Sequence, residues 1–335
     1  FASANPQALV ESIEFDIFGF SRGAAAARHF ANEVLKTSTG VIAKYLDAKS
    51  PIFAPDFSIE AEMRINFIGL FDTVAAVGDP ARGHLSVGDA HNPGVNLYLP
   101  PDCACKVVHL TAADEHRHNF SLNRVTEAHE ELVLPGVHSN LGGGYPTLSY
   151  ERLMLGTPVF FLSDESPLDG RARHKLVRSD AWLTRQREEA LFRERGLPGD
   201  GRLVLHEHAV RRMPRALVLL GLSIERTVRG ELSRVPLRIM HAKGLESSVP
   251  FDSINEHDDR FTIPADLKAI ADKVYAAAMS GCSPTLSRDE RRFLHSRYIH
   301  SSANWAPVKG FMANKPRNGF TRAIYPDRQP EKYPV

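Results

Sequence analysis

The sequence predicts an α/β fold in which helices flank a mostly parallel sheet and a cap-like or lid-like region is inserted. Two observations predict it. Short apolar runs rich in β-branched and aromatic residues, such as residues 64–71 and 106–110, alternate with longer helix-forming segments. Polar residues of catalytic type follow several of these runs, and α/β sheets place their chemistry at the carboxyl ends of strands.

Composition narrows the class of protein. The chain has 335 residues, of which 43% are hydrophobic and 24% charged, as expected for a globular protein with one large domain or two smaller ones. The net charge of +1 gives no reason to expect a nucleic-acid partner. The apolar run at residues 216–222 is too short to cross a bilayer, and no signal peptide is visible. The cysteines, Cys103, Cys105 and Cys282, fit neither a disulfide framework nor a zinc site.

The most informative segment spans residues 13–30. A strand-like run meets the sequence Gly-Phe-Ser-Arg-Gly at residues 19–23, and an alanine-rich, helix-forming segment follows at once. In this setting G-x-S-x-G indicates a nucleophile elbow, in which a tight turn presents a serine above the sheet and the flanking glycines allow strand and helix to approach closely. Ser21 is therefore the candidate nucleophile of an α/β-hydrolase fold.

The elbow lies early in the chain. In an α/β-hydrolase several strands normally precede the nucleophile, together with the loop that supplies half of the oxyanion hole. We therefore expect the sequence to lack an N-terminal part of the domain. The Arg22 backbone N–H is the predicted first oxyanion donor, and the second is expected on the missing side.

Asp72 is the candidate catalytic acid. It follows the apolar run at residues 64–71, which reads as a buried strand. Asp is also favoured in turns and at helix N-caps, and for Asp72 considered alone this alternative is the stronger one.

His138 is the candidate base. It follows a strand-like run at residues 131–134 and enters a loop containing three consecutive glycines, residues 142–144. The loop has neither the Lys-Ser/Thr ending nor the glycine spacing of a phosphate-binding motif. His300 is the rival base, because α/β-hydrolases often place their histidine late, but no apolar strand directly precedes it.

Ser21, Asp72 and His138 follow the chain order of the α/β-hydrolase triad, each after a predicted strand. The chemistry requires all three, since serine is a weak nucleophile until a histidine removes its proton and a carboxylate orients the imidazole. A metal site at His116 and His118 is the weaker interpretation, because no further ligands complete a recognisable set. No cofactor or metal is expected.

The motifs around these residues resemble one family. Residues 19–28, 69–78, 112–117, 135–145 and 297–305 are similar to the type VI secretion lipase effectors of the first class. The resemblance implies an α/β-hydrolase domain with antibacterial phospholipase A1 or A2 activity, and it assigns the family's triad to Ser21, Asp72 and His138. Two departures are the absence of a Phe-x-Asp-Gly-Thr segment and the presence of Asn140 where the family often has Asp.

The family also implies partners and a place of action. It predicts secretion into the periplasm of a target bacterium, contact with the phospholipid membrane surface of that cell, a secretion-spike protein and an immunity protein. The alternatives are a hydrolase of another acyl ester and a non-catalytic interaction module of a secretion system, since a fold by itself does not select a substrate.

Three parts are expected along the chain: a catalytic core at 1–150, an insertion or cap at 151–250 and a helical part returning to the core at 251–335. Within the insertion, residues 182–195 look helical. The segment 211–222 is either a lid that meets lipid or, by preference, a buried strand or helix with surface arginines. Residues 266–280 predict an amphipathic helix ended by Gly281, and a capping box at 287–290 begins another.

Overall fold

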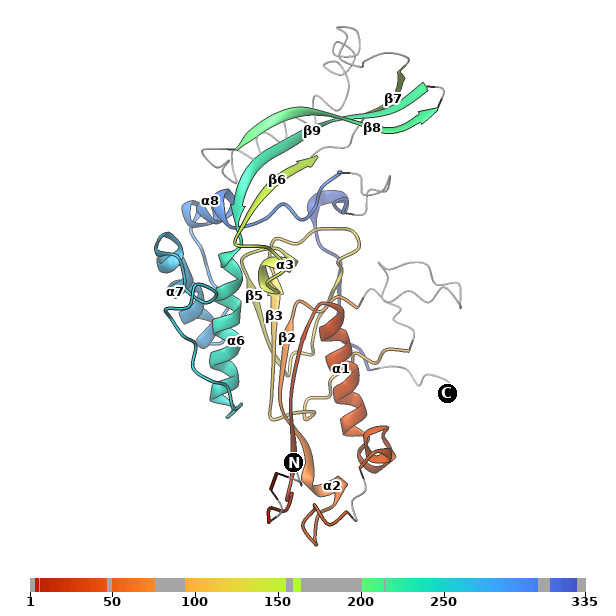
Figure 1. The fold of residues 1–335 in the computed structure, drawn as a ribbon, viewed down its shortest axis with the longest axis vertical. Coiled ribbons are helices and arrows are strands. Elements are labelled where there is room, and N and C mark those ends of the chain that lie inside the picture. The colour runs from red at the N-terminus through yellow and green to blue at the C-terminus, as the bar shows by residue number, and fades with distance from the viewer. Residues whose placement is uncertain are drawn as a thin grey trace.

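The computed structural model describes residues 4–5, 7–46, 50–75, 94–154, 159–163, 201–213, 215–306 and 314–329. Within them, a four-stranded parallel sheet has the order β1-β2-β3-β5 (Figure 1). The strands are β1 (Ile13–Phe20), β2 (Met63–Phe71), β3 (Lys106–Ala112) and β5 (Glu130–Leu134). All four predicted strands are confirmed, and the α/β-hydrolase-like fold class with them.

Helix α1 (Arg22–Leu35) covers one face of the sheet. Its small residues Ala24, Ala27 and Ala31 are buried against the strands, because alanines allow a close approach of helix and sheet. The helix is followed by the short 3-10 turns η1 (Thr37–Thr39) and η2 (Ile42–Lys44). A single turn, α2 (Ile59–Glu62), precedes β2.

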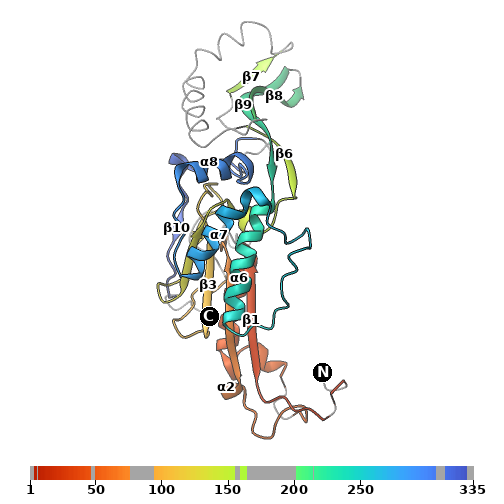
Figure 2. The same cartoon turned by 90° about the vertical axis from the view of Figure 1, so that its left-hand side faces the viewer.

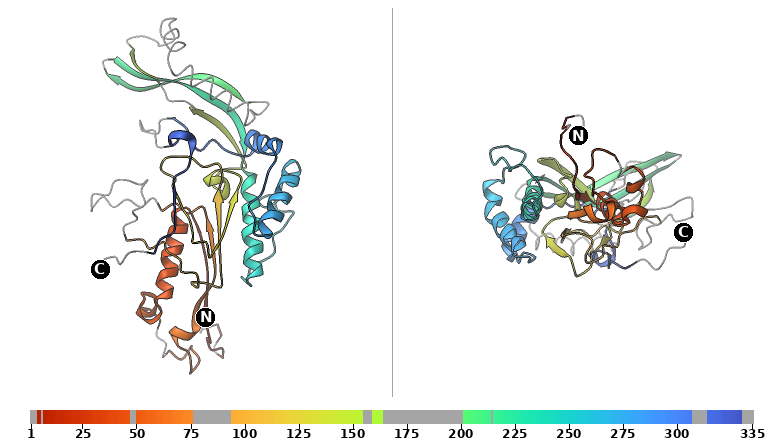
Figure 3. Two further views of the ribbon diagram at one scale, coloured as in Figure 1. Left: turned by 180° about the vertical axis from the view of Figure 1, so that it is seen from behind. Right: turned by 90° about the horizontal axis from the view of Figure 1, so that it is seen from below.

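The opposite face of the sheet is covered by α6 (Arg234–Glu246) and α7 (Ala265–Met279), as Figure 2 and Figure 3 show. The predicted apolar face of α7 is buried, and Gly281, after the helix, has φ 73°. The predicted capping box begins α8 (Arg288–Arg297): the Glu290 N–H donates to Ser287 Oγ, and the Ser287 N–H to Glu290 Oε2. Both helix predictions are confirmed.

A bulge in β2 decides which side chains face α6. Phe15 pairs with Ile65 and Asp16 with Phe67, so Asn66 is the extra residue. The extra residue reverses the alternation of side chains, and Phe67 therefore joins the core on the α6 side whereas Ile65 packs with α1.

A second sheet lies at one end of the first (Figure 1). It is antiparallel, with β9 in contact with each of the other three strands. The strands are β6 (Leu148–Met154), β7 (Val159–Ser163), β8 (Arg202–Met213) and β9 (Arg215–Arg229). Residues 211–213 and 215–222 are thus strand in β8 and β9, while the choice between a buried element and a lid stays a prediction, and the predicted helix at 182–195 lies outside the described residues.

The last described segment, residues 314–329, contributes one strand to a separate two-stranded sheet. Its strand β10 (Ile324–Tyr325) pairs with β4 (Leu122–Asn123) after the turn η5 (Asn318–Phe320). Near its end, Asp327 forms a buried ion pair of 2.9 Å with Arg28 of α1. Helix α6 shares a core with α7, although it precedes residue 250, and the three-part division of the chain stays a prediction. In the described part of the chain, no helix has the length and hydropathy of a membrane span.

Candidate active site

The predicted elbow is present between β1 and α1. Ser21 has φ 58° and ψ −122°, a backbone conformation that non-glycine residues rarely adopt and that is typical of strained functional turns. A Cβ at Gly19 would lie 2.4 Å from the Gly23 carbonyl oxygen, so the close approach of strand and helix requires glycine there. A Cβ at Gly23 would meet nothing within 4 Å, and only one of the two motif glycines is therefore required by space.

Ser21 and Asp72 lie at the same edge of the sheet in related positions. The Ser21 N–H donates to the Phe71 carbonyl at 3.0 Å, and the Asp72 N–H donates to the Leu110 carbonyl at 2.7 Å. Each residue thus continues its strand's pairing for one step before the chain turns away. Asp72 has φ 45°, so both candidates carry positive φ at the ends of neighbouring strands.

The fully buried carboxylate of Asp72 has four donors. Oδ2 lies 2.5 Å from His138 Nδ1, and Oδ1 accepts from the Ala112 N–H at 2.9 Å. Arg322 binds both oxygens, with Nη1 2.6 Å from Oδ1 and Nη2 2.8 Å from Oδ2. Burial by itself would raise the pKa of Asp72, but the charge of Arg322 and the hydrogen bonds from His138 and Arg322 hold it below the ordinary range.

His138 lies at a helix start rather than in the predicted loop. It is the first residue of the short helix α3 (His138–Leu141), because Val137 and Asn140 exchange hydrogen bonds across the turn. The imidazole ring is flanked by two aromatic rings, Phe20 at 4.5 Å and Phe120 at 4.8 Å between centroids. These rings and the bond to Asp72 fix the orientation of the imidazole.

The Glu115 carboxylate stabilises the turn that carries His138. Its Oε2 accepts the His138 backbone N–H at 3.2 Å and bonds Arg117 Nη2 at 2.8 Å. Burial would raise the pKa of Glu115, but the hydrogen bond and charge of Arg117 lower it, so the carboxylate stays ionised. Arg117 in turn lies over the Phe120 ring, 3.3 Å from its centroid.

Ser21 and Asp72 thus follow neighbouring strands at one edge of the sheet, and His138 contacts Asp72 there. Asp72 and His138 are directly bonded, while the described hydrogen bonds include none between Ser21 Oγ and His138 Nε2. Such contacts are often long in the absence of substrate. Arg22 is the first residue of α1, where backbone N–H groups have no acceptor within the helix.

The rival base His300 occupies a different environment. Its Nδ1 lies 3.2 Å from Asn140 Nδ2, its Nε2 lies 2.9 Å from Ser149 Oγ, and its ring stacks on Tyr145 at 3.5 Å between centroids. Burial, and then the charge of Arg226, lower the pKa of His300 to about 3, so the ring is neutral at neutral pH. The Asn140 side chain also donates to the Tyr298 carbonyl and thus ties the His138 turn to the segment around His300.

Among the described residues, no group of three or more His, Cys, Asp and Glu side chains is arranged to hold a metal ion. The two histidines considered for a metal contact backbone carbonyls instead: His116 Nδ1 lies 3.0 Å from the Asp114 oxygen and His118 Nδ1 lies 3.1 Å from the Lys315 oxygen.

Arg322 is a residue of the candidate site that no sequence motif indicates. It lies 250 positions from Asp72 and two residues before the start of β10, so no local pattern connects the two. Its Nε also donates to the Phe120 carbonyl at 2.7 Å, which links the carboxylate to the ring beside His138.

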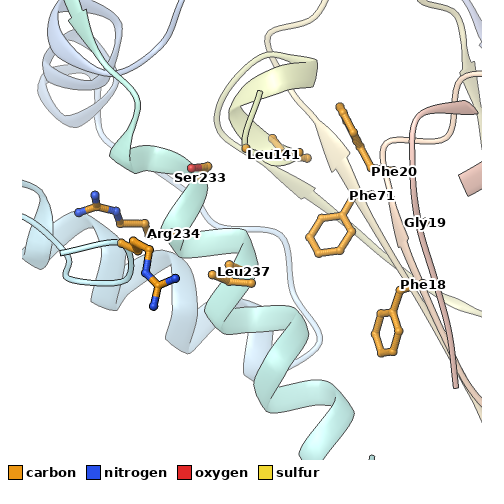
Figure 4. Close-up of a pocket in the computed structure, with 11 residues that line it drawn as sticks. Phe18, Gly19, Phe20, Phe71, Leu141, Ser233, Arg234 and Leu237 are labelled. Carbon is orange, nitrogen blue, oxygen red and sulfur yellow. The ribbon is translucent and has the colours of Figure 1, made fainter. Parts of the chain in front are cut away.

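A cavity of about 390 Å³ adjoins the site. Figure 4 shows Phe18, Phe20 and Phe71 from the sheet facing Leu237 of α6, with Leu141 beside them. Since Phe20 directly precedes Ser21 and contacts His138, the cavity begins next to the candidate catalytic residues.

The parallel sheet, the strained serine turn and the Asp–His pair are the features of an α/β-hydrolase-like protein. Residues 49–164 match the family model for the catalytic domain of Tle1-like phospholipase effectors of the type VI secretion system. The chain is also similar to the Tle1 effector, solved bound to the VgrG spike, with 30% identity and a TM-score of 0.75 over 95% of this chain and 68% of that chain. The chain therefore belongs to the Tle1-like family of type VI secretion phospholipase effectors, which confirms the predicted resemblance.

A second similar structure is an uncharacterised protein from Pseudomonas aeruginosa, with 21% identity and a TM-score of 0.38 over 85% of this chain and 30% of that chain. The search of curated proteins found no significant match. Membership of the family makes the chain a hydrolytic effector that is secreted into target cells.

Proposed function

We propose that this effector is a serine phospholipase A in which Ser21 is the nucleophile, His138 the general base and Asp72 the residue that orients the base. The observation that best supports the proposal is the 2.5 Å contact between Asp72 Oδ2 and His138 Nδ1 beside a serine with φ 58°. A proton on Nδ1 donated to Asp72 leaves the lone pair of Nε2 free to accept the serine proton.

The reaction proceeds in two halves. Ser21 Oγ attacks the carbonyl carbon of an acyl ester while His138 Nε2 takes its proton, and the Arg22 N–H stabilises the resulting oxyanion. The intermediate collapses to an acyl-serine, and the leaving lysophospholipid oxygen takes the proton from His138. Water then attacks the acyl-serine while His138 accepts its proton, and His138 returns that proton to Ser21 Oγ as the second intermediate collapses and releases the fatty acid.

The partners follow from the family and remain part of the proposal. The Tle1 effector was solved bound to the VgrG spike, and we propose a spike protein of this kind as the delivery partner of this chain. The phospholipid membrane of the target bacterium, reached from the periplasm, is the proposed substrate surface, and an immunity protein is the proposed antagonist in the producing cell.

The test uses phospholipid vesicles labelled on either the sn-1 or the sn-2 acyl chain. The protein is expected to release a labelled fatty acid, and Ser21→Ala to reduce the rate at least about a thousandfold. Ser280→Ala, an exposed serine after α7, is the matched control and keeps the full rate. The position of the released label distinguishes A1 from A2 activity.

Two results favour the alternatives. Hydrolysis of a short-chain chromogenic ester without release from phospholipid indicates another acyl-ester substrate. Full activity in Ser21→Ala contradicts the proposed nucleophile, and inactivity on every ester favours an interaction module.

A further inference from the structure

We propose that two adjoining cavities between the sheet and α6 form one groove that binds the fatty acyl chain of the substrate, with Leu237 as a residue that determines acyl-chain length. This inference rests on the proposed function and adds to it the place where the lipid chain lies. The cavity beside Phe20 measures about 390 Å³ and the next about 380 Å³. Each lies within the range of small-molecule sites, about 300–1,000 Å³.

The cavities share three wall residues, Phe18, Phe71 and Leu237, and are therefore neighbours. Beyond these, the second cavity is lined mainly by apolar side chains of α6 and the segment that follows it, which are Met240, Phe251, Ile254 and Phe261. The shared walls define a path that leads from Phe20, next to Ser21, toward Phe251.

The wall residues leave much apolar surface uncovered. Phe18, Leu237 and Phe251 are 38%, 39% and 36% exposed, and the rings of Phe18 and Phe251 lie 5.4 Å apart between centroids. Neighbouring large apolar side chains that remain exposed are typical of a binding surface, because an apolar occupant removes their surface from water. A hydrocarbon chain is such an occupant.

Two glycines keep the groove open. A Cβ at Gly69 would lie 2.5 Å from Phe18 Cδ1 and 2.8 Å from Met240 Sδ, so glycine allows the Phe18 ring to lie low over the sheet. A Cβ at Gly142 would lie 2.3 Å from Phe20 Cζ, and glycine allows that ring to pack beneath the turn after α3. Side chains at these positions would push both rings toward the space that we assign to the lipid.

The groove begins next to the candidate catalytic residues, where the acyl chain of a bound ester would enter it. Phe20 lines the first cavity, directly precedes Ser21 and contacts the His138 ring at 4.5 Å between centroids. A carbonyl carbon placed at Ser21 Oγ therefore has its acyl chain at the entrance to the groove. Short chains would occupy the first cavity, and longer chains would reach the second.

The test compares two substitutions on the same helix. Leu237→Trp fills the groove, whereas Leu245→Trp, at a leucine of α6 that is 47% exposed and lines neither cavity, is the matched control. We expect Leu237→Trp to lower kcat/KM for 4-nitrophenyl palmitate at least about tenfold more than for 4-nitrophenyl butyrate, since the long chain loses the contacts of several methylene groups that the four-carbon chain never makes. Leu245→Trp is expected to leave both rates within about twofold.

A second measurement does not depend on catalysis. Equilibrium binding of a fluorescent sixteen-carbon fatty acid is expected to weaken in Leu237→Trp and to be unchanged in Leu245→Trp. Equal affinity in both variants, or equal loss of the palmitate and butyrate rates in Leu237→Trp, overturns the groove. Failure of the proposed function gives a different result: ester hydrolysis persists in Ser21→Ala, or the wild type hydrolyses no ester. In either case the fatty-acid binding measurement still tests the groove.

Discussion

Arg322 binds Asp72 with two parallel hydrogen bonds of 2.6 and 2.8 Å, although 250 positions separate the two residues. The same carboxylate contacts His138 Nδ1 at 2.5 Å. In this arrangement the guanidinium fixes the plane of the carboxylate, and its charge favours the ionised form that the imidazole needs as a partner. The last described segment of the chain thus contributes directly to the geometry of the candidate active site.

Replacement of this arginine has a predictable effect on pH dependence. Arg322→Gln removes the charge that holds the pKa of Asp72 down, and burial then raises that pKa. Because activity requires ionised Asp72, the acidic limb of the kcat/KM profile is expected to move to higher pH. Leaving the carboxylate without its cation also lowers the free energy of unfolding by about 3–5 kcal/mol, measured by urea denaturation.

The controls for Arg322 lie on the same segment. Arg322→Lys keeps a charge but not the paired geometry, and partial recovery of the acidic limb is expected. Arg317→Gln, at an exposed position five residues earlier, should leave the pH profile and the stability unchanged. An unshifted acidic limb in Arg322→Gln would show that the arginine does not control Asp72.

The two glycines of the elbow are expected to respond differently to alanine. Gly19→Ala places a Cβ against the Gly23 carbonyl and the backbone of Ala24, and the overpacking should cost about 1–3 kcal/mol of unfolding free energy. Gly23→Ala meets open space within α1, where alanine is a better helix former, and should stabilise the protein by up to about 1 kcal/mol. Thermal or urea unfolding of both variants measures the difference, and equal effects would contradict the close approach at Gly19.

Buried His300 makes stability depend on pH. Its pKa is about 3 in the folded protein and about 6.5 in an unfolded chain, so the unfolded state binds more protons between these values. The contribution of His300 is fully present above pH 6.5 and is lost as the pH falls toward 3. Between pH 6.5 and 5 the wild type should therefore lose about 1–2 kcal/mol more stability than His300→Gln.

This variant also separates His300 from the proposed base. The neutral ring contacts Asn140 and Ser149 rather than Asp72, so His300→Gln should keep measurable esterase activity at neutral pH, whereas His138→Ala should lose at least about a thousandfold. His109, whose pKa burial also lowers, is present in both proteins and cancels from the stability comparison. Parallel stability curves for wild type and His300→Gln would rule out the assigned titration.

Much of the local structure could be predicted from the chain alone. The apolar runs at 64–71, 106–110 and 131–134 are strands, the turn at Ser21 joins a strand to a helix, and the capping box at Ser287 begins α8. These features depend on side-chain periodicity, caps and turn residues within a few positions of one another, and the chain carries that information locally. The order of Ser21, Asp72 and His138 along these strands likewise indicated one edge of one sheet.

The remaining features required the folded chain. His138 begins a helix because the Asn140 side chain caps the turn. Arg322 contacts Asp72 because β10 pairs with β4. The proposed groove is formed because α6 crosses the sheet opposite Phe18. The bulge at Asn66 follows from the pairing of β2 with β1. Glycine is required at Gly19 and not at Gly23 because backbone atoms lie close to a Cβ at the first position only. Sequence periodicity specifies which face of an element is apolar, but the packing of distant segments decides which partner covers that face. For the same reason, only the packed structure places Arg322 beside Asp72 and forms the proposed groove between the sheet and α6.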